Sequence, residues 1–374
     1  TAPYRGGIAH HNNLLVRSLR DRGHTVDAIT FQRQYPSFLY PGRFQEEEGP
    51  EFSDIQAERL LDSMNPISWA KVGRLLKKRE YDAYLTRFWI PLFGPMLSRI
   101  QRHVGGGVSG GHVATIVDNL FPHEKRLGDR FFTQLQFRYC NGVITQSGTV
   151  SKQIAQEFPQ VPETMIPHPV YEHFGEVRDQ SEARVIVGEG PGPLLLFFGF
   201  IRKYKGLDLL LEALPEIRRK SPDVRLLVVG EYFGDEEFYR EIIERLGLEE
   251  VVRVVDRYIP NEEVGDWFSA ADLLVLPYRS ATNSGIVQIG YNFAIPSIVT
   301  DVGSLSEVVI DGKTGRVIAE PTPELLADAV ASILSPGERQ SLAAAIVEER
   351  KRYSWPVFAE RVEEFLIETF DIRD

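Results

Sequence analysis

Apolar and polar positions follow two recurring patterns along the second half of the chain. The run Leu194–Phe198 is continuously apolar and ends at Gly199, which is typical of a strand buried on both faces. The segment Leu207–Leu214 has helical periodicity and is expected to end near Pro215. Further strands are predicted at 224–229, 251–255, 273–276 and 297–300, and further helices at 238–246, 262–271 and 287–293. This alternation predicts right-handed βαβ units and a parallel sheet.

The first half shows the same alternation less regularly. A helix is predicted at 14–22, and strands at 25–30, 83–86, 113–117 and 142–145. Gly6-Gly7 opens a helix, and such a glycine turn normally follows a strand, yet only five residues precede it. We expect that strand to lie before the numbered sequence; the alternative is a domain that lacks it.

The chain has 374 residues, more than the ~250–300 at which a single core stops growing, so two domains are expected. We predict an α/β fold of two doubly wound, Rossmann-like parallel-sheet domains that face a central cleft. Ligands bind such sheets at the carboxyl ends of their strands. The domains are placed at 1–170 and 171–354, and the amphipathic segment 355–374 is expected to form a helix that packs back on the N-terminal domain.

Composition narrows the class of protein. The hydrophobic fraction of 43% and the charged fraction of 25% are those of an ordinary globular protein. Cys140 is the one cysteine, which excludes an internal disulfide and a cysteine-built metal site. The apolar runs are too short to cross a membrane and the start does not resemble a signal peptide, so a cytoplasmic protein is expected. The net charge of −11, concentrated in the second half, argues against a nucleic-acid partner.

Three turns that precede helices are candidate anion sites. Gly6-Gly7 allows backbone N–H groups to approach an anion at a helix N-terminus. The loop 199–206 carries Arg202, Lys203 and Lys205 beside a helix start, where unpaired cations oppose the helix dipole unless an anion binds. Ser284-Gly285-Ile286 offers a hydroxyl and backbone donors. The alternatives are a plain tight turn, a solvated basic loop and simple helix capping, respectively.

A set of short motifs follows a fixed order along the second half of the chain, at 198–199, 205–213, 228–230, 258–260, 270–277, 296–299, 307–309 and 311–315. The first half adds Gly6-Gly7-Ile8 and the segment 118–124. In this order the motifs resemble the family 4 retaining glycosyltransferases of the GT-B fold. The resemblance covers the second half almost continuously and is thinner in the first half.

This resemblance implies a UDP- or GDP-linked sugar as co-substrate, with no separate cofactor. It implies that Arg202 and Lys205 hold the diphosphate, helped by Gly6, Gly7 and the amides of Ser284, Gly285 and Ile286. Tyr258 and Ile259 would contact the base and Glu231 the nucleoside. The N-terminal domain would bind a carbohydrate or lipid-linked acceptor, and the C-terminal domain the nucleotide sugar.

The chain departs from the family pattern at two places. The positions of the Glu-x7-Glu pair hold Ala281 and Ile289, so the contact to the ribose is either lost or supplied from elsewhere, with Gln288 as a candidate. Phe200 also stands where an arginine is usual, and Arg202 is its expected substitute.

Asp118 occupies the usual place of a histidine beside the sugar, where a carboxylate would bind hydroxyls or stabilise positive charge. His123 is close enough in sequence to reach the same site. The alternatives are a helix-capping role for Asp118 and a supporting role for His123.

Two charged features lie outside these motifs. Five basic residues lie on or near one predicted helix: Lys71, Arg74, Lys77, Lys78 and Arg79. They would allow the helix to contact an anionic membrane at its periphery, and the alternative is a solvated helix face. The carboxylate runs 46–48 and 235–237 lack the spacing of a metal site, so no metal is assigned.

The sequence therefore predicts a metal-independent enzyme of polysaccharide or glycolipid biosynthesis that transfers a hexose with retention. Arg202, Lys205, Asp118 and His123 are its candidate catalytic residues. A GT-B-like sugar-nucleotide epimerase, a phosphorylase and an inactive partner subunit remain open as alternatives.

Overall fold

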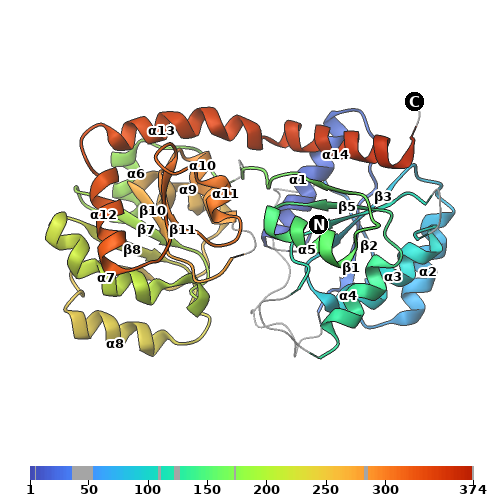
Figure 1. The fold of residues 1–374 in the computed structure, drawn as a ribbon, viewed down its shortest axis with the longest axis horizontal. Helices are drawn as coiled ribbons and strands as arrows, with labels where there is room; N and C mark the ends of the chain where they lie inside the picture. The colour runs from blue at the N-terminus through green and yellow to red at the C-terminus, as the bar shows by residue number, and fades with distance from the viewer. Residues whose placement is uncertain are drawn as a thin grey trace. The chain divides into compact units, whose positions relative to one another are not determined.

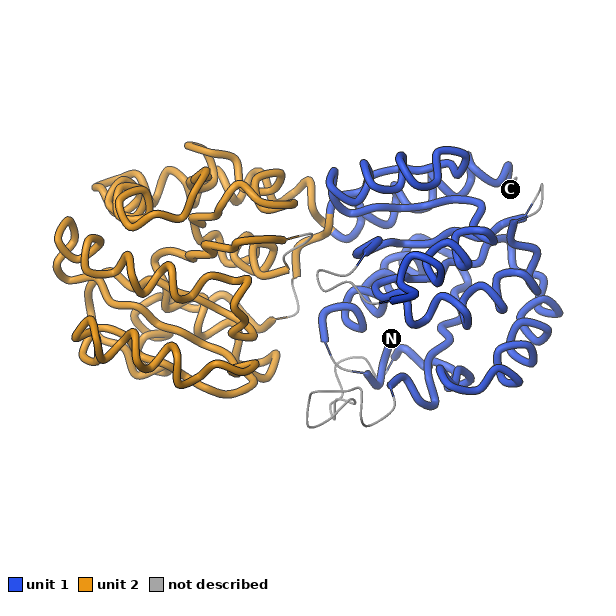
Figure 2. Tube along the Cα trace, turned by 60° about the horizontal axis from the view of Figure 1, so that its bottom comes forward, with its two compact units in different colours: residues 1–167, 355–374 blue, residues 168–354 orange. Residues whose placement is uncertain are grey.

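The computed structural model describes residues 1–4, 6–35, 54–107, 111–121, 127–171, 174–281 and 285–372. The chain divides into two compact units (Figure 2). Unit 1 comprises Thr1–Pro167 and Trp355–Asp374, and unit 2 comprises His168–Ser354. Each unit is described by itself below.

Unit 2 contains one parallel sheet with the strand order β12-β11-β10-β7-β8-β9. Its strands are β7 (Leu194–Phe198), β8 (Arg225–Val229), β9 (Val252–Val255), β10 (Leu273–Leu276), β11 (Ser297–Thr300) and β12 (Gly315–Ile318). All five residues of β7 are buried, as predicted for a strand covered on both faces (Figure 1). The chain leaves β7 toward β8 and β9 and then returns to β10 on the other side, so the strand order reverses between β7 and β10.

The described helices of unit 2 connect and cover this sheet. They are α6 (Gln180–Val187), η3 (Lys203–Lys205), α7 (Leu207–Lys220), α8 (Glu236–Leu246), α9 (Asn261–Ala270), α10 (Gly285–Asn292), α11 (Leu305–Val308), α12 (Pro323–Ile333), α13 (Glu338–Glu349) and η4 (Arg350–Tyr353). The expected end of α7 near Pro215 is wrong, because the helix continues through this residue to Lys220. Proline removes one helix hydrogen bond, and the burial of Leu214 and Ile217 on either side offsets that loss.

Unit 1 contains two groups of parallel strands. The pair β1 (Ile29–Arg33) and β2 (Glu58–Asp62) lies beside a sheet of order β3-β4-β5-β6, formed by β3 (Tyr84–Phe88), β4 (Val113–Val117), β5 (Gly142–Thr145) and β6 (Glu163–Met165). Its helices are α1 (Gly7–Asp21), α2 (Pro66–Lys77), η2 (Pro91–Phe93), α3 (Gly94–His103), α4 (Asp129–Phe137), α5 (Gly148–Glu157) and α14 (Trp355–Phe370). The first strand begins four residues later than predicted, because Thr25–Ala28 forms the approach to it.

A cavity of about 810 Å³ lies between β1 and β3 in unit 1. Ile29 and Phe31 of β1 line it on one side, and Leu85 and Arg87 of β3 on the other. Apolar residues of α1 and α3 also face it. Among the described residues, β1 pairs with β2 and β3 pairs with β4, but β1 and β3 do not pair with each other.

The C-terminal helix α14 packs on unit 1. Trp355, Phe358, Val362 and Phe365 join a core cluster with residues of α1, β4 and β5. In this way the end of the chain covers the sheet formed by its first half (Figure 1). Within the described part of the chain, no helix combines the length and the apolar composition that crossing a membrane would require.

Candidate functional site

The loops after β7 and β10 meet where the strand order of unit 2 reverses. Such a reversal places neighbouring loops on opposite faces of the sheet and leaves a crevice at the carboxyl ends of the strands. The backbone N–H of Arg279, after β10, donates to the Tyr204 carbonyl at 2.7 Å, and its side chain donates to the Lys203 carbonyl at 2.9 Å. The same guanidinium pairs with both carboxylate oxygens of Asp208, at 2.7 and 2.6 Å. Arg279 therefore fixes the basic loop against β10, a role that sequence reasoning missed.

Glycines bring this loop close to its neighbours. Gly199 has φ +94°, and a methyl group added to it would lie 3.0 Å from Lys205 Nζ and 3.3 Å from Ile286 Cδ1. A methyl group on Gly230, which follows β8, would lie only 2.3 Å from the Gly199 carbonyl oxygen. The Ile201 N–H donates to the Glu231 carbonyl at 2.8 Å, which joins the two loops. The end of β7, the end of β8 and the start of α10 thus converge around Lys205.

Lys205 is a buried cation in this cluster. Its residue is 8% exposed, and Nζ lies 5.7 Å from the centre of the Tyr278 ring. Arg202 lies nearby and stacks on Phe233, with Cζ 3.8 Å from the ring centre. Burial, and then the charge of Arg202, lower the pKa of Lys205 to about 7. Among the described residues, neither cation forms an ion pair with a carboxylate. Two adjacent cations without a counter-ion are the arrangement that an anionic ligand would complete.

The predicted donor residues of unit 2 fall into two groups. Ile286 contacts the Lys205 cluster, and Gly285 lies against the Tyr171 ring. The Gln288 side chain is 1% exposed, and neither of its amide atoms has a hydrogen-bond partner among the described residues. By contrast, Tyr258 and Ile259 follow β9, which is separated from β7 by β8. Ser284 lies outside the described residues.

The Glu-x7-Glu departure has a structural explanation at one of its two positions. Ile289 is 4% exposed and belongs to the buried side of α10, where a carboxylate would need a partner. A methyl group on Gly303 would overlap the Ala281 carbonyl, so the backbone at Ala281 is packed closely. Gln288 is therefore the buried polar side chain on this part of α10 that has capacity for a ligand.

In unit 1, Asp118 belongs to a buried polar network. Arg87 Nε donates to Asp118 Oδ2 at 2.7 Å, and a second guanidinium nitrogen donates to Oδ1. The same arginine donates to Asn12 at 3.0 Å and to Gln146 at 3.2 Å. The Gln146 amide in turn lies 2.7 Å from His11 Nε2. The Asp118 carboxylate is therefore held by Arg87 through both of its oxygens, and no helix among the described residues begins directly after it.

The structure places the other predicted residues of unit 1 in different surroundings. Gly6, with φ +100°, precedes the first turn of α1, and Gly6 and Gly7 line the 810 Å³ cavity. His123 lies outside the described residues, as does the carboxylate run at 46–48. Lys71, Arg74 and Lys77 are exposed on α2, and Lys78 is exposed directly after it. Arg79 is not on that face, because its guanidinium pairs with Glu58.

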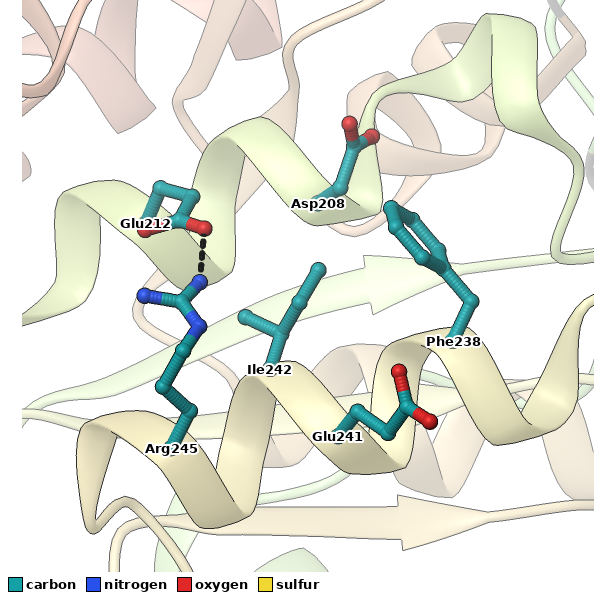
Figure 3. A pocket seen from close by; sticks show the side chains of 6 residues that line it. All are labelled: Asp208, Glu212, Phe238, Glu241, Ile242 and Arg245. Carbon is teal, nitrogen blue, oxygen red and sulfur yellow. Dashed lines mark hydrogen bonds and ion pairs between the residues drawn. The ribbon is translucent and has the colours of Figure 1, made fainter.

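A second hollow, of about 250 Å³, lies between α7 and α8 (Figure 3). Phe238 and Ile242 form its apolar side, and Glu212 pairs with Arg245 across it. Because its Asp208 carboxylate already binds Arg279, the charges around this hollow are largely paired within the protein. No cluster of three or more potential metal ligands occurs among the described residues.

Comparison with known proteins identifies the architecture. Residues 5–173 match the family described as Glycosyltransferase Family 4, and residues 192–336 match the one described as Glycosyl transferases group 1. The chain belongs to the family 4 glycosyltransferases. Its family 4 fold is similar to a sucrose-phosphate synthase from Thermosynechococcus elongatus, with a TM-score of 0.73 and 17% identity over 98% of this chain and 94% of that one. The Anabaena protein Alr3699/HepE, solved with UDP and glucose, gives the same score and identity over 98% of both chains. The GT-B fold is thereby established.

Sequence relatives of this family 4 chain include two named transferases. A D-inositol 3-phosphate glycosyltransferase from Kribbella flavida is 30% identical over 192 residues, 49% of this chain and 45% of the relative. The lipopolysaccharide core biosynthesis mannosyltransferase LpsB of Rhizobium meliloti is 28% identical over 223 residues, 57% of this chain and 60% of that protein. The chain spans about half the length of the curated relatives that it matches.

The buried charge of Lys205 generates a prediction about stability and pH. Because its pKa is about 7 in the folded state and about 10.4 in the unfolded state, the folded protein binds fewer protons between these values, and its stability rises with pH there. Lys205→Met removes this penalty. We expect Lys205→Met to raise the unfolding free energy above that of the unmodified protein by more at pH ~6 than at pH ~9. The two increases, measured by urea titration, should differ by at least about 1.4 kcal/mol. Lys203→Met, at an exposed position, is the control and should show no such difference. Equal gains for Lys205→Met at both pH values would contradict the buried charge.

The Arg87–Asp118 pair generates a second prediction. Asp118→Asn leaves the Arg87 charge buried without its counter-ion, so the unfolding free energy should fall by about 3 kcal/mol. The matched control is Asp54→Asn in the same unit, whose pair with Arg17 is half-exposed and should contribute less than about 1 kcal/mol. Chemical denaturation of both variants gives the comparison. Equal losses would show that the buried pair contributes no more to the unfolding free energy than the half-exposed pair does.

Proposed function

We propose that this protein transfers a hexose from a nucleotide-diphosphate sugar to a carbohydrate or lipid-linked acceptor, with retention of anomeric configuration. The observation that carries the proposal is the buried Lys205 beside Arg202, at the strand reversal of unit 2 and without a carboxylate partner among the described residues. The names of the relatives, which include an inositol phosphate glycosyltransferase and a mannosyltransferase, support the reaction class.

Stabilisation of the departing diphosphate is the chemistry that this cluster suits. Charge develops on the diphosphate as the bond to the sugar breaks, and fixed cations in a water-poor site stabilise it without reorganisation. Lys205 and Arg202 would supply that charge, and the first amides of α10, from Gly285 and Ile286, would donate hydrogen bonds. The hydrogen bonds of Arg279 to the Lys203 carbonyl and to Asp208 hold the loop 199–206 in place without a ligand.

The other proposed donor contacts come from α10 and from the loops after β8 and β9. Gln288 would bind the ribose hydroxyls in place of the carboxylate that the family usually carries. Glu231, on the loop joined to Ile201, would approach the nucleoside. Ser284, Tyr258 and Ile259 complete the proposed donor set.

Unit 1 is proposed to bind the acceptor and to contribute Gly6 and Gly7 to the donor site. Because Arg87 holds both oxygens of Asp118, we propose that Asp118 accepts hydrogen bonds from sugar hydroxyls as a fixed carboxylate and transfers no proton. His123 is the further candidate beside the sugar.

A binding experiment tests the donor site directly. We expect UDP or GDP to bind in calorimetry; the solved Alr3699/HepE complexes with UDP make UDP the first ligand to examine. Lys205→Met should weaken binding by roughly 10–150-fold, because a charged contact contributes about 1.5–3 kcal/mol. The exposed Lys203→Met variant should bind as the unmodified protein does. Absence of binding for both nucleotides at millimolar concentration, or equal effects of the two variants, would contradict the proposal.

An NMR time course with donor alone distinguishes transfer from epimerisation, which needs no acceptor.

We also propose that α2 contacts anionic membranes from its exposed face. Lys71, Arg74 and Lys77 flank two exposed apolar side chains, Ile67 at 82% and Leu75 at 38% exposure. A surface of this kind suits interfacial binding, in which each cation contributes about 1 kcal/mol. The protein should sediment with phosphatidylserine vesicles, and Lys71→Glu together with Arg74→Glu should abolish this. Equal sedimentation of the charge-reversed variant would remove α2 from the membrane contact.

A further inference from the structure

The Arg202 side chain rests on the face of one aromatic ring. Its Cζ lies 3.8 Å from the centre of the Phe233 ring, well inside the ~6 Å limit of a cation–π contact. Among the residues that the structure describes, the Arg202 guanidinium donates no hydrogen bond and pairs with no carboxylate. A planar guanidinium that stacks through its face keeps its N–H donors at its edge, where an anion binds in a bidentate way. The contact with Phe233 therefore orients Arg202 without using its hydrogen-bonding groups.

Other arginines of unit 2 are held in a different way. Arg253 lies 6.0 Å from the centre of the Trp267 ring, but it also pairs with Glu189. Arg279 likewise pairs with a carboxylate. In both cases the protein itself supplies the oxygen atoms that accept from the guanidinium. Arg202 combines a closer ring with N–H donors that no described residue engages.

Backbone hydrogen bonds fix Phe233 beside the loop that carries Arg202. The Phe233 N–H donates to the Ile201 carbonyl at 3.0 Å, and the Ile201 N–H donates to the Glu231 carbonyl at 2.8 Å. These two bonds extend the parallel pairing of β7 and β8 beyond the ends of both strands. The Phe200 ring packs edge-on against the Phe233 ring, with the ring centres 6.3 Å apart. The sheet therefore sets the position of the Phe233 ring, and the ring sets the position of the cation.

A cation next to Lys205 needs such a support. Lys205 is buried, and its pKa is lowered to about 7 by burial and then by the positive charge of Arg202, so the two cations repel each other. An arginine side chain without a fixed contact would also gain rotamer freedom by turning into solvent. The negative face of the Phe233 ring attracts the guanidinium and opposes both effects. This contact keeps Arg202 beside Lys205 before an anion binds.

We propose that Phe233 is a positioning residue of the donor site, which holds the Arg202 guanidinium in the orientation that a diphosphate requires. Donors that are already ordered bind an anion more tightly, because binding does not have to immobilise them. Phe233 acts through Arg202 and makes no contact of its own with the diphosphate. This inference rests on the proposed donor site, to which it adds a residue without a charge or a hydrogen-bonding side chain.

A double-mutant cycle on nucleotide binding tests this role. In calorimetry with UDP, Phe233→Leu should weaken binding by roughly 5–30-fold, the factor expected of a partly desolvated cation–π contact. In the Arg202→Met background the same substitution should change the affinity by less than about twofold, because no guanidinium is left to position. Phe233→Trp keeps an aromatic face and should bind UDP as the unmodified protein does.

The matched control is Phe238→Leu, on α8 of the same unit (Figure 3). Phe238 is 43% exposed and Phe233 is 40% exposed, but among the described residues no cation lies over the Phe238 ring. This variant should bind UDP as the unmodified protein does. Because the Phe233 ring is partly exposed, Phe233→Leu is expected to fold, and Phe233→Met takes its place if it does not.

NMR of the ligand-free protein checks the stack without a nucleotide. Because Cζ of Arg202 lies over the Phe233 ring, the neighbouring Nε–H signal should be shifted upfield by the ring. The signal is assigned by its absence in Arg202→Met, and it should return to the ordinary arginine position in Phe233→Leu. An unshifted signal in the unmodified protein would overturn the inference.

The binding data separate failure of this inference from failure of the donor site. If UDP binds and Phe233→Leu leaves its affinity unchanged, or weakens it equally with and without Arg202, Phe233 does not act through Arg202 while the donor site stands. If the unmodified protein binds neither UDP nor GDP, the donor site itself is wrong, and the role of Phe233 is lost with it.

Discussion

Unit 2 depends on one position in its parallel sheet, the central strand from which the chain proceeds first to one side and then to the other. In unit 2, β7 fills this position with five buried apolar residues and ends at Gly199, so the loops on either side of it meet around Lys205. In unit 1, Gly6 and Gly7 stand at the start of α1 and line the cavity of about 810 Å³. The position of the cation cluster in unit 2 is thus set by its central strand.

The second organising factor is uncompensated charge. A folded protein rarely retains a buried ammonium group without a counter-ion, because the desolvation cost lowers its pKa and destabilises the fold. Among the described residues, other buried charged side chains are paired, such as Asp272 with Arg184 and Arg87 with Asp118. The described surroundings of Lys205 offer it a tyrosine ring and another cation. This contrast makes unit 2 the better-supported half of the proposed site.

The sequence predicted features that depend on local pattern. Leu194–Phe198 was predicted as a buried strand from its continuous apolar run, and the structure confirms it. The end of α7 at Pro215 was wrong, because a local breaker signal was outweighed by burial on both sides. Long-range pairings were beyond sequence reasoning: Arg87 lies 31 residues before Asp118 and carries no motif, and Arg279 lies 71 residues after Asp208. Arg79 was placed with the basic face of α2 because its partner Glu58 belongs to a strand that the sequence did not indicate.

The close approach of Gly230 to the Gly199 carbonyl limits which changes the junction of β7 and β8 can accept. Neither backbone can move apart without breaking the junction of β7 and β8, and no side chain fits at position 230. The side chains beyond it are also packed, because Tyr232 stacks on Tyr239 and the Arg202 guanidinium lies over the Phe233 ring. A substitution at any of these positions would therefore be transmitted to the loop that carries Arg202 and Lys205.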